Sequence, residues 1–124
     1  MADQWKEGRI RKMTDVNELY KLSEKLKDEG KFDEAIVKLH ELLALDEKHT
    51  LSHLALAVIY GKTGQHEEAV KHGQRACELE PNEPFNFTAM SVTFQRAWQG
   101  TQNQQFIQLA EDAMARAHEL QGRA

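Results

Sequence analysis

The sequence has 124 residues and a formal net charge of −4, with 16 basic and 20 acidic side chains. A chain of this length suits one compact domain that buries a core without metal or disulfide support. The single cysteine, Cys77, excludes an intramolecular disulfide and a multi-cysteine zinc site. No apolar signal core and no run of about eighteen apolar residues occurs. We therefore expect a cytoplasmic protein without a membrane span.

The first fourteen residues are basic, whereas the remainder of the chain is acidic. Four basic residues between Lys6 and Lys12 outweigh two acidic ones, which gives +2 and leaves −6 for residues 15–124. This acidic body argues against nucleic-acid binding. We expect residues 1–14 to be a flexible basic N-terminal extension. Contact with an acidic partner, or with the chain's own acidic body, is the alternative.

Two short apolar stripes with helical spacing follow this extension. The first consists of Leu19, Leu22, Ser23 and Leu26, and the second of Ala35, Ile36, Leu39, Leu42 and Leu43. Asp15 and Glu18 have capping-box spacing before the first stripe, and Gly30 can take a positive φ in the turn between the two. Because the connection is short, we expect two antiparallel helices, the first starting near Asp15.

The same design returns thirty-four residues later, and then a third time. Gly64, Ala69 and Leu79 occupy the positions of Gly30, Ala35 and Leu45, while Phe87, Met90, Ser91 and Phe94 occupy those of His53, Leu56, Ala57 and Tyr60. No strand pattern interrupts the helical periodicity. The sequence therefore predicts three repeats, at about residues 16–49, 50–83 and 84–120.

The third repeat departs from this period. The alanine pair that matches Ala69 and Ala76 is Ala110 and Ala117, seven residues later than the period predicts. We expect an insertion near residues 95–105 and a last helix at about residues 103–120. The polar outer face of that helix would cap the stack; alternatively, a second subunit covers Ile107 and Met114.

A thirty-four-residue helix-turn-helix period with a large–small pair in the first helix, a glycine at the turn, an alanine in the second helix and a proline after it resembles the tetratricopeptide repeat family. The best matching positions are Leu56, Ala57, Tyr60, Gly64, Ala69, Ala76 and Pro81. The resemblance covers about residues 16–120. It implies an all-α fold over residues 15–124: a right-handed superhelix of antiparallel helix pairs, or α-solenoid, of about six helices. Small side chains would let neighbouring helices approach closely.

The resemblance also implies that the first helices of the repeats line a concave groove that receives peptides or helices from other proteins. The residues that fall on this groove are Tyr20, Glu24, Lys27, Leu51, Leu54, Val58, Lys62, Phe85, Thr88, Val92 and Arg96. Its floor would be apolar and one edge cationic. An apolar segment or an amphipathic helix with acidic groups near Lys27, Lys62 and Arg96 is the expected ligand.

Another ligand class of the family is not expected here. Members that hold a chaperone's C-terminal carboxylate use lysine, asparagine and arginine at set groove positions. This chain has Tyr20, Glu24, Ala55, Phe85 and Ala89 at those positions. The resemblance therefore implies no carboxylate clamp.

Catalytic, metal and cofactor sites are not expected. The chain lacks a phosphate-binding glycine loop, a nucleophile elbow and a helical His-Glu-x-x-His motif. The six histidines are scattered, and His53 shares its repeat position with Leu19 and Phe87, which predicts a packed interior imidazole. Cys77, beside Ala76, is expected to be a small half-buried hydrophobe rather than a reactive thiol.

We therefore expect a protein–protein interaction adaptor or scaffold that binds a peptide or helix of another protein. The alternative is a self-assembling structural module that forms homo-oligomers, including a homodimer, through the groove or the last helix. Trp5, Ile10 and Met13 could enter the groove of the same chain or of a neighbour, in which case the working surface would lie elsewhere, for example at Trp98.

Overall fold

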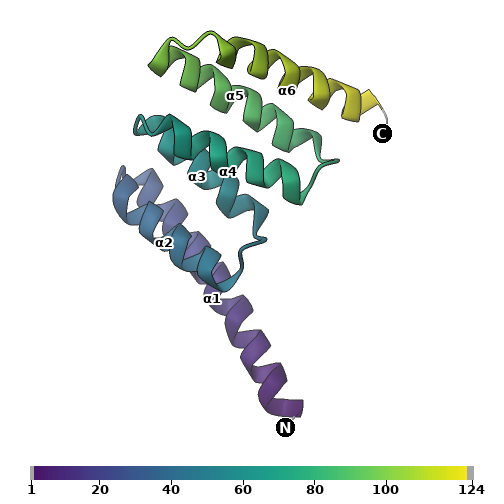
Figure 1. Ribbon diagram of the computed structural model, residues 1–124. Coiled ribbons are helices and arrows are strands. Elements are labelled where there is room, and N and C mark those ends of the chain that lie inside the picture. Colours follow the sequence, from purple (N-terminus) through teal and green to yellow (C-terminus); the bar gives the residue numbers. More distant parts are fainter. Residues whose placement is uncertain (1, 123–124) are drawn as a thin grey trace. The chain divides into compact units, whose positions relative to one another are not determined.

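The computed structural model describes the backbone of residues 2–122 and the side chains of residues 7–122. These residues form six helices and no strand: α1 (Ala2–Asp28), α2 (Phe32–Leu45), α3 (Thr50–Lys62), α4 (His66–Leu79), α5 (Pro84–Thr101) and α6 (Gln105–Gly122) (Figure 1). They fall into two compact units, divided within α3 between Ser52 and His53. We call the part before this division unit 1 and the part after it unit 2. The predicted all-α class is confirmed.

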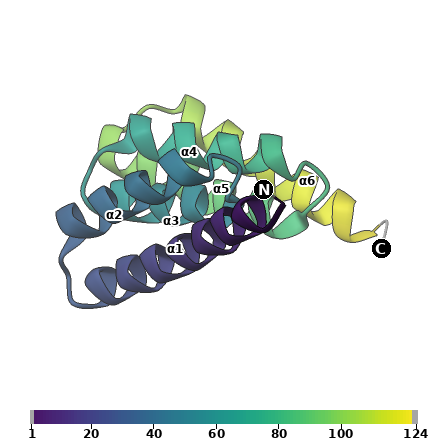
Figure 2. The same ribbon diagram turned by 90° about the horizontal axis from the view of Figure 1, so that it is seen from below.

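Unit 1 is an antiparallel pair in which α1 packs along α2 (Figures 1 and 2). Val16, Ala35, Leu39 and Leu42 are its buried apolar residues. Gly30 closes α1 with a φ of 77°, and the backbone N–H of Lys31 donates to the carbonyl of Leu26 at 2.8 Å. A glycine is needed here because residues with a Cβ atom rarely adopt this left-handed backbone conformation.

The first helix is longer than the sequence predicted. It starts at Ala2 rather than near Asp15, so Asp15 and Glu18 lie inside α1 and do not cap it. The apolar stripe that located the helix begins only where α1 meets α2. Residues 2–14 contain no proline and are mostly good helix formers, so the helix continues although the described side chains of residues 7–15 are exposed. The expected helix start was therefore wrong.

Unit 2 repeats this design. α4 packs against α5, and α5 packs against its antiparallel neighbour α6 (Figure 1). Gly64 has a φ of 81°, and the N–H of Gln65 donates to the carbonyl of Tyr60 at 2.8 Å, as Lys31 does to Leu26 thirty-four residues earlier. Met90, Phe94, Ala110 and Ala113 form a buried cluster, with Val70, Cys77 and Phe106 packed against it. The same turn thus connects the two helices of a pair in both cases, α1 to α2 and α3 to α4.

Small residues lie where helices approach each other. Ala57, Ala69, Ala76 and Ser91 are all buried, as the repeat pattern predicted. Gly73 was not foreseen in this role. A Cβ atom on Gly73 would come within 2.6 Å of the Met90 sulfur and 3.8 Å of the Ala57 Cβ atom. The close contact of α4 with α5 therefore depends on the missing side chain of Gly73.

His53 is buried, which confirms its predicted interior position. Its Nδ1 atom lies 3.0 Å from Nδ1 of His72, and the two rings stack with centroids 5.3 Å apart. The Tyr60 ring also stacks on the His72 ring, with centroids 5.7 Å apart. One imidazole must donate and the other accept, so the pair acts as a polar link between α3 and α4.

The insertion in the third repeat lengthens helices and leaves the loop unchanged. α5 has 18 residues where α3 has 13, which accounts for five of the seven inserted residues. Ala110 is the sixth residue of α6 whereas Ala69 is the fourth of α4, which accounts for the other two. Gln102 ends α5 in the left-handed conformation with a φ of 59°. The Asn103 side chain then accepts a hydrogen bond from the N–H of Gln105.

Candidate interaction surfaces

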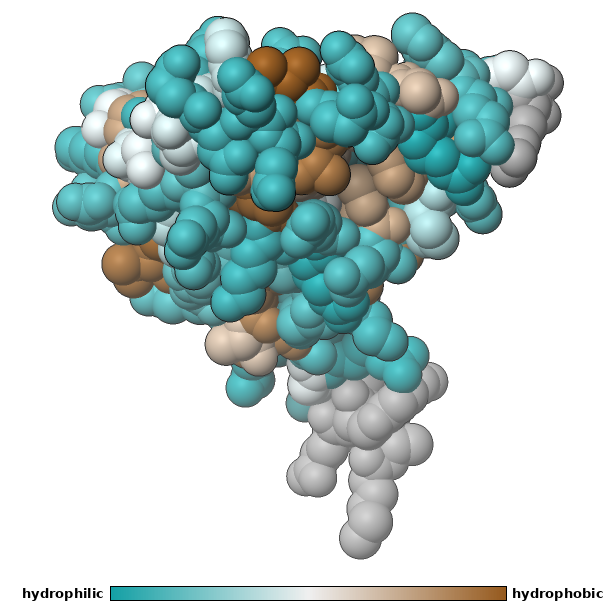
Figure 3. Space-filling model, turned by 45° about the horizontal axis from the view of Figure 1, so that its top comes forward, coloured by the Kyte–Doolittle hydropathy of each residue, from teal (hydrophilic) through white to brown (hydrophobic). Residues whose placement is uncertain are grey.

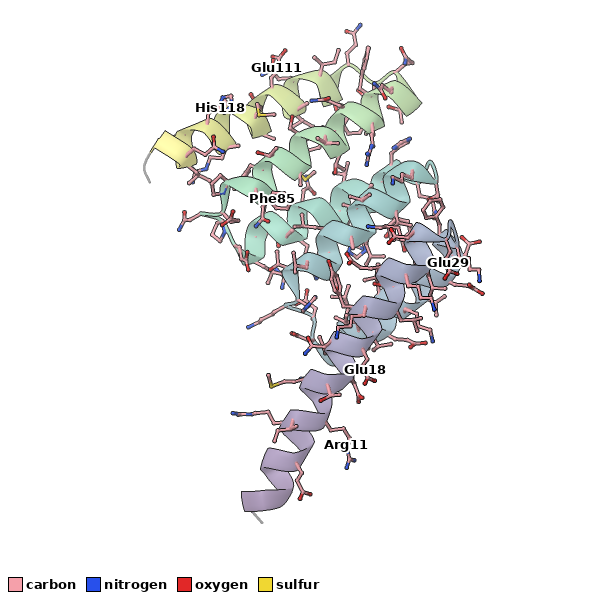
Figure 4. All side chains as sticks on the ribbon, turned by 180° about the vertical axis from the view of Figure 1, so that it is seen from behind. Arg11, Glu18, Glu29, Phe85, Glu111 and His118 are labelled. Carbon is pink, nitrogen blue, oxygen red and sulfur yellow. The ribbon has the colours of Figure 1, made fainter. Side chains whose placement is uncertain are left out.

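The predicted groove residues of the third repeat form one stripe along α5. Phe85 and Val92 are 60% and 40% exposed, and Thr88 and Arg96 are partly exposed. Figure 4 shows Phe85 at the N-terminal end of this helix. Pro84 occupies the first turn, and the Glu83 carboxylate accepts a hydrogen bond from the N–H of Phe85 at 3.3 Å. The cap thus fixes an aromatic residue that remains open to solvent.

The matching stripe of α3 in unit 2 consists of Leu54, Val58 and Lys62. Val58 is half-buried and Lys62 is exposed, but Leu54 is only 8% exposed. A Cβ atom on Gly61 would lie 3.5 Å from Cδ of Arg96, so the end of α3 adjoins α5. Lys62 and Arg96 therefore bring two positive charges to the same end of unit 2, while Leu54 supports the surface from beneath.

The remaining groove candidates lie in unit 1. Tyr20, Glu24 and Lys27 share one stripe of α1, and Leu51 is exposed on the first turn of α3. Burial, the negative charge of Glu24 and a hydrogen bond with Glu24 raise the pKa of Tyr20. Its ring also meets His49, with centroids 5.5 Å apart. Tyr20 is therefore positioned within unit 1 by its hydrogen bond with Glu24 and by its ring contact with His49.

An apolar hollow of about 450 Å³ opens between α5 and α6. Its lining includes Ser91, Gln95 and Trp98 of α5 and Ile107, Glu111 and Met114 of α6. The sequence offered Trp98 and the pair Ile107 and Met114 as separate alternatives, and the structure brings the three together. Ile107 remains 40% exposed, so the polar residues of α6 do not cover it. Figure 3 turns α5 and α6 toward the viewer and shows brown apolar patches among hydrophilic side chains.

A second hollow of unit 2, of about 540 Å³, was missed by the sequence analysis. It is bounded by α4, α5 and α6, and its lining includes Cys77, Phe87, Met90, Leu109 and Arg116. The Arg116 guanidinium lies 5.8 Å from the centre of the Phe87 ring. The repeat pattern gave no signal for it, because the pattern marks the residues where helices touch and not the spaces beside them.

Cys77 behaves as the sequence predicted. Burial, followed by the negative charge of Glu78, raises the pKa of its thiol from 9.0 to about 11. The thiol points its hydrogen toward the carbonyl of Asn86, at 3.6 Å. Because the thiolate is the reactive form, Cys77 is a packing residue at neutral pH.

Comparison with known proteins agrees with this arrangement of helix pairs, which defines the chain as a helical repeat protein. Residues 26–84 match the family model described as tetratricopeptide repeat. These residues belong to the tetratricopeptide repeat family, and the chain as a whole has the all-α solenoid fold of that family. No curated protein sequence matches the chain.

Solved structures with the same fold cover most of the chain. MamA superposes with a TM-score of 0.74 at 17% identity, over 87% of this chain and 59% of MamA. The chain thus spans less than two thirds of that protein. The second tetratricopeptide repeat domain of Spaghetti (RPAP3), bound to the HSP90 peptide SRMEEVD, superposes with a TM-score of 0.74 at 21% identity. The match covers 92% of this chain and 98% of that domain. PcrH in complex with the chaperone-binding region of PopD superposes with a TM-score of 0.58 at 20% identity. The match covers 87% of this chain and 92% of PcrH.

None of the six helices within residues 2–122 combines the length and the apolar character that crossing a bilayer requires.

Proposed function

We propose that the chain is a protein-interaction adaptor that binds an apolar or amphipathic segment of another protein on the first helices of its repeats, chiefly on the stripes of α3 and α5 in unit 2. The observation that carries the proposal is the exposed apolar stripe of α5. Phe85 and Val92 stay open to solvent at the repeat positions where the family fold implies a groove. Two proteins of similar fold were solved with segments of partner proteins, which supports a binding role over a catalytic one.

The positive charges on this face favour a ligand that carries an acidic residue. Lys62 and Arg96 lie toward the same end of unit 2, where the C-terminus of α3 adjoins α5. A ligand with an acidic residue at one end and apolar residues along its length would satisfy both parts of this face. Tyr20, Glu24, Lys27 and Leu51 hold the corresponding repeat positions in unit 1. With Phe85 and Ala89 at clamp positions, a free C-terminal carboxylate is not the expected anchor.

The energetics allow a useful complex. Burying a side chain such as Phe or Val contributes about 1.5–3 kcal/mol before ordering costs. Phe85, Val58 and Val92 together would contribute at most about 5–9 kcal/mol, and the loss of translational and rotational freedom on binding offsets about 4 kcal/mol or more of this, so these three residues support a weak complex that the contacts of the charged residues would strengthen. Leu54 contributes only through its support of this face, since it is already buried.

The test is a peptide selected from a random library for binding to the chain, followed by titration against matched variants. Val92→Glu should weaken binding about tenfold or more, because it places a charge in the apolar stripe. Val37→Glu is the control: Val37 is an exposed valine of α2, 54% exposed against 40% for Val92, outside the proposed face. Equal losses in both variants, or none in Val92→Glu, would contradict the proposal.

A further inference from the structure

We propose that the hollow between α5 and α6 is a socket for the N-terminal part of α1 from a second copy of the chain. We call the hollow, lined by Ser91, Gln95, Trp98, Ile107, Glu111 and Met114, the end socket. Residues 2–14 of α1 are called the arm. This inference concerns surfaces other than the proposed groove and does not depend on it.

The chain itself shows what packs on a helix pair at this position. In unit 2, α5 lies against Gly61, His66 and Gly73 of the preceding pair: a Cβ atom on Gly61 would meet Arg96, one on Gly73 would meet Met90, and one on Gly100 would overlap the His66 ring. One repeat later the corresponding positions are Gln95, thirty-four residues after Gly61, and Ile107 and Met114, which follow His66 and Gly73 by thirty-four residues plus the seven inserted ones. All three line the end socket, so the socket lies where one more helix would pack, with larger side chains than the glycines of the preceding pair.

The arm is a helix with an uncovered apolar side. Ile10 and Met13 are 64% and 61% exposed and lie three residues apart, on neighbouring positions of the helix surface. α1 has 27 residues and α2 has 14, so the arm extends beyond its partner within unit 1 (Figure 1). A thirteen-residue helix is about 20 Å long, which fits beside the 18 residues of α6.

Charge favours the socket as the arm's partner. Residues 1–14 carry +2, whereas α6 carries Glu111, Asp112 and Glu119 against Arg116. Glu111 lines the socket itself and is labelled on α6 in Figure 4. Arg11 and Lys12 are exposed beside the apolar residues of the arm. Two arms would repel each other, so pairing of arm with socket is electrostatically preferred over pairing of arm with arm.

The contact is heterologous, because two different surfaces meet. Such contacts close into a ring or a swapped dimer if the geometry allows, and otherwise form open chains. In either case each copy uses one arm and one socket, and this requirement can be tested with two single substitutions. Met13→Glu disables the arm, and Ile107→Glu disables the socket, each at an exposed position.

The experiment is sedimentation velocity of the full chain at several concentrations. The wild type should associate, and each variant alone should stay monomeric at concentrations where the wild type is associated, because each substitution weakens association about tenfold or more. An equimolar mixture of the two variants should form a 1:1 dimer, since one still has a socket and the other an arm. Val37→Glu should associate as the wild type does.

Other outcomes overturn the proposal. If Ile107→Glu alone still associates, arms pair with arms; if Met13→Glu alone still associates, sockets pair with sockets. A wild type that stays monomeric, or a mixture that stays monomeric, also contradicts it. Circular dichroism verifies that each variant is folded, and Glu111→Lys, at an exposed rim position, replaces Ile107→Glu if the latter unfolds.

Discussion

Side chains of minimal size decide how closely the helices of unit 2 approach. Ala57 and Ala69 could be identified from the sequence because they recur in the repeat pattern. Gly73 could not, since Leu39 occupies the same position one repeat earlier and the pattern therefore requires no small residue there. Its importance follows only from the position of Met90, which reaches across from α5. A comparison of repeat sequences therefore misses small residues, such as Gly73, whose role depends on a side chain of the next repeat.

Gly73→Ala should lower the free energy of unfolding by about 1 kcal/mol, because the overlap of the new methyl group with the end of the buried Met90 side chain costs about 1–3 kcal/mol and the higher helix propensity of alanine offsets about 1 kcal/mol. Gly8→Ala is the matched control. A Cβ atom there meets nothing within 4 Å, so the same substitution should stabilise α1 by about 0.5–1 kcal/mol. Urea unfolding of both variants measures the difference. A neutral Gly73→Ala would show that Met90 moves aside freely.

Helix lengths were predicted less well than helix positions. The apolar stripes located the helix pairs in the chain, but α1 and α5 both extend beyond their stripes. An exposed helical segment such as residues 7–15 leaves no periodic apolar signal, because nothing packs against it. For the insertion predicted near residues 95–105, the sequence favoured a longer last helix or a longer loop before it, whereas α5 has 18 residues where α3 has 13. The residues near Gln102 settle this in favour of longer helices.

Gln102 holds the end of α5 in a conformation that favours glycine. Gln102→Gly should raise the free energy of unfolding by about 0.5–1 kcal/mol, because it removes the strain of a positive φ at the end of the helix. The two hydrogen bonds from its side chain to the carbonyls of Trp98 and Gln99 are exposed and should offset little of this gain.

Gln99→Gly serves as the comparison, since this exposed residue lies inside α5 and glycine there should destabilise by about 0.5–1 kcal/mol. Denaturant titration of the two variants should give changes of opposite sign. A loss of stability in both would mean that the backbone at residue 102 is not the strained position.

At the scale of the whole molecule, the sequence was enough to predict the fold, because a period of thirty-four residues restricts the chain to stacked helix pairs. It was less informative about surfaces. Phe85 and Val92 are open as expected, whereas Leu54 is buried, since one stripe can contain both packed and exposed positions. The end socket required three-dimensional information, because Trp98 comes from the lengthened part of α5 and lines the same hollow as Ile107 and Met114 of α6.

Each repeat position therefore has a dual meaning, as part of the core or as part of a surface, and only packing distinguishes them. For binding, the decisive question is which surface of unit 2 a ligand contacts. The stripe of α5 with Lys62 and Arg96 is one answer; the hollow around Cys77 and Leu109 is a different one.

The most direct measurement is a two-dimensional amide NMR titration of the full chain with the library-selected peptide. The account predicts that the largest shift changes occur at Val58 and Lys62 of α3 and at Val92 and Arg96 of α5. Changes concentrated instead at Cys77, Leu109 and Arg116, with the α3 and α5 stripes unaffected, would contradict it.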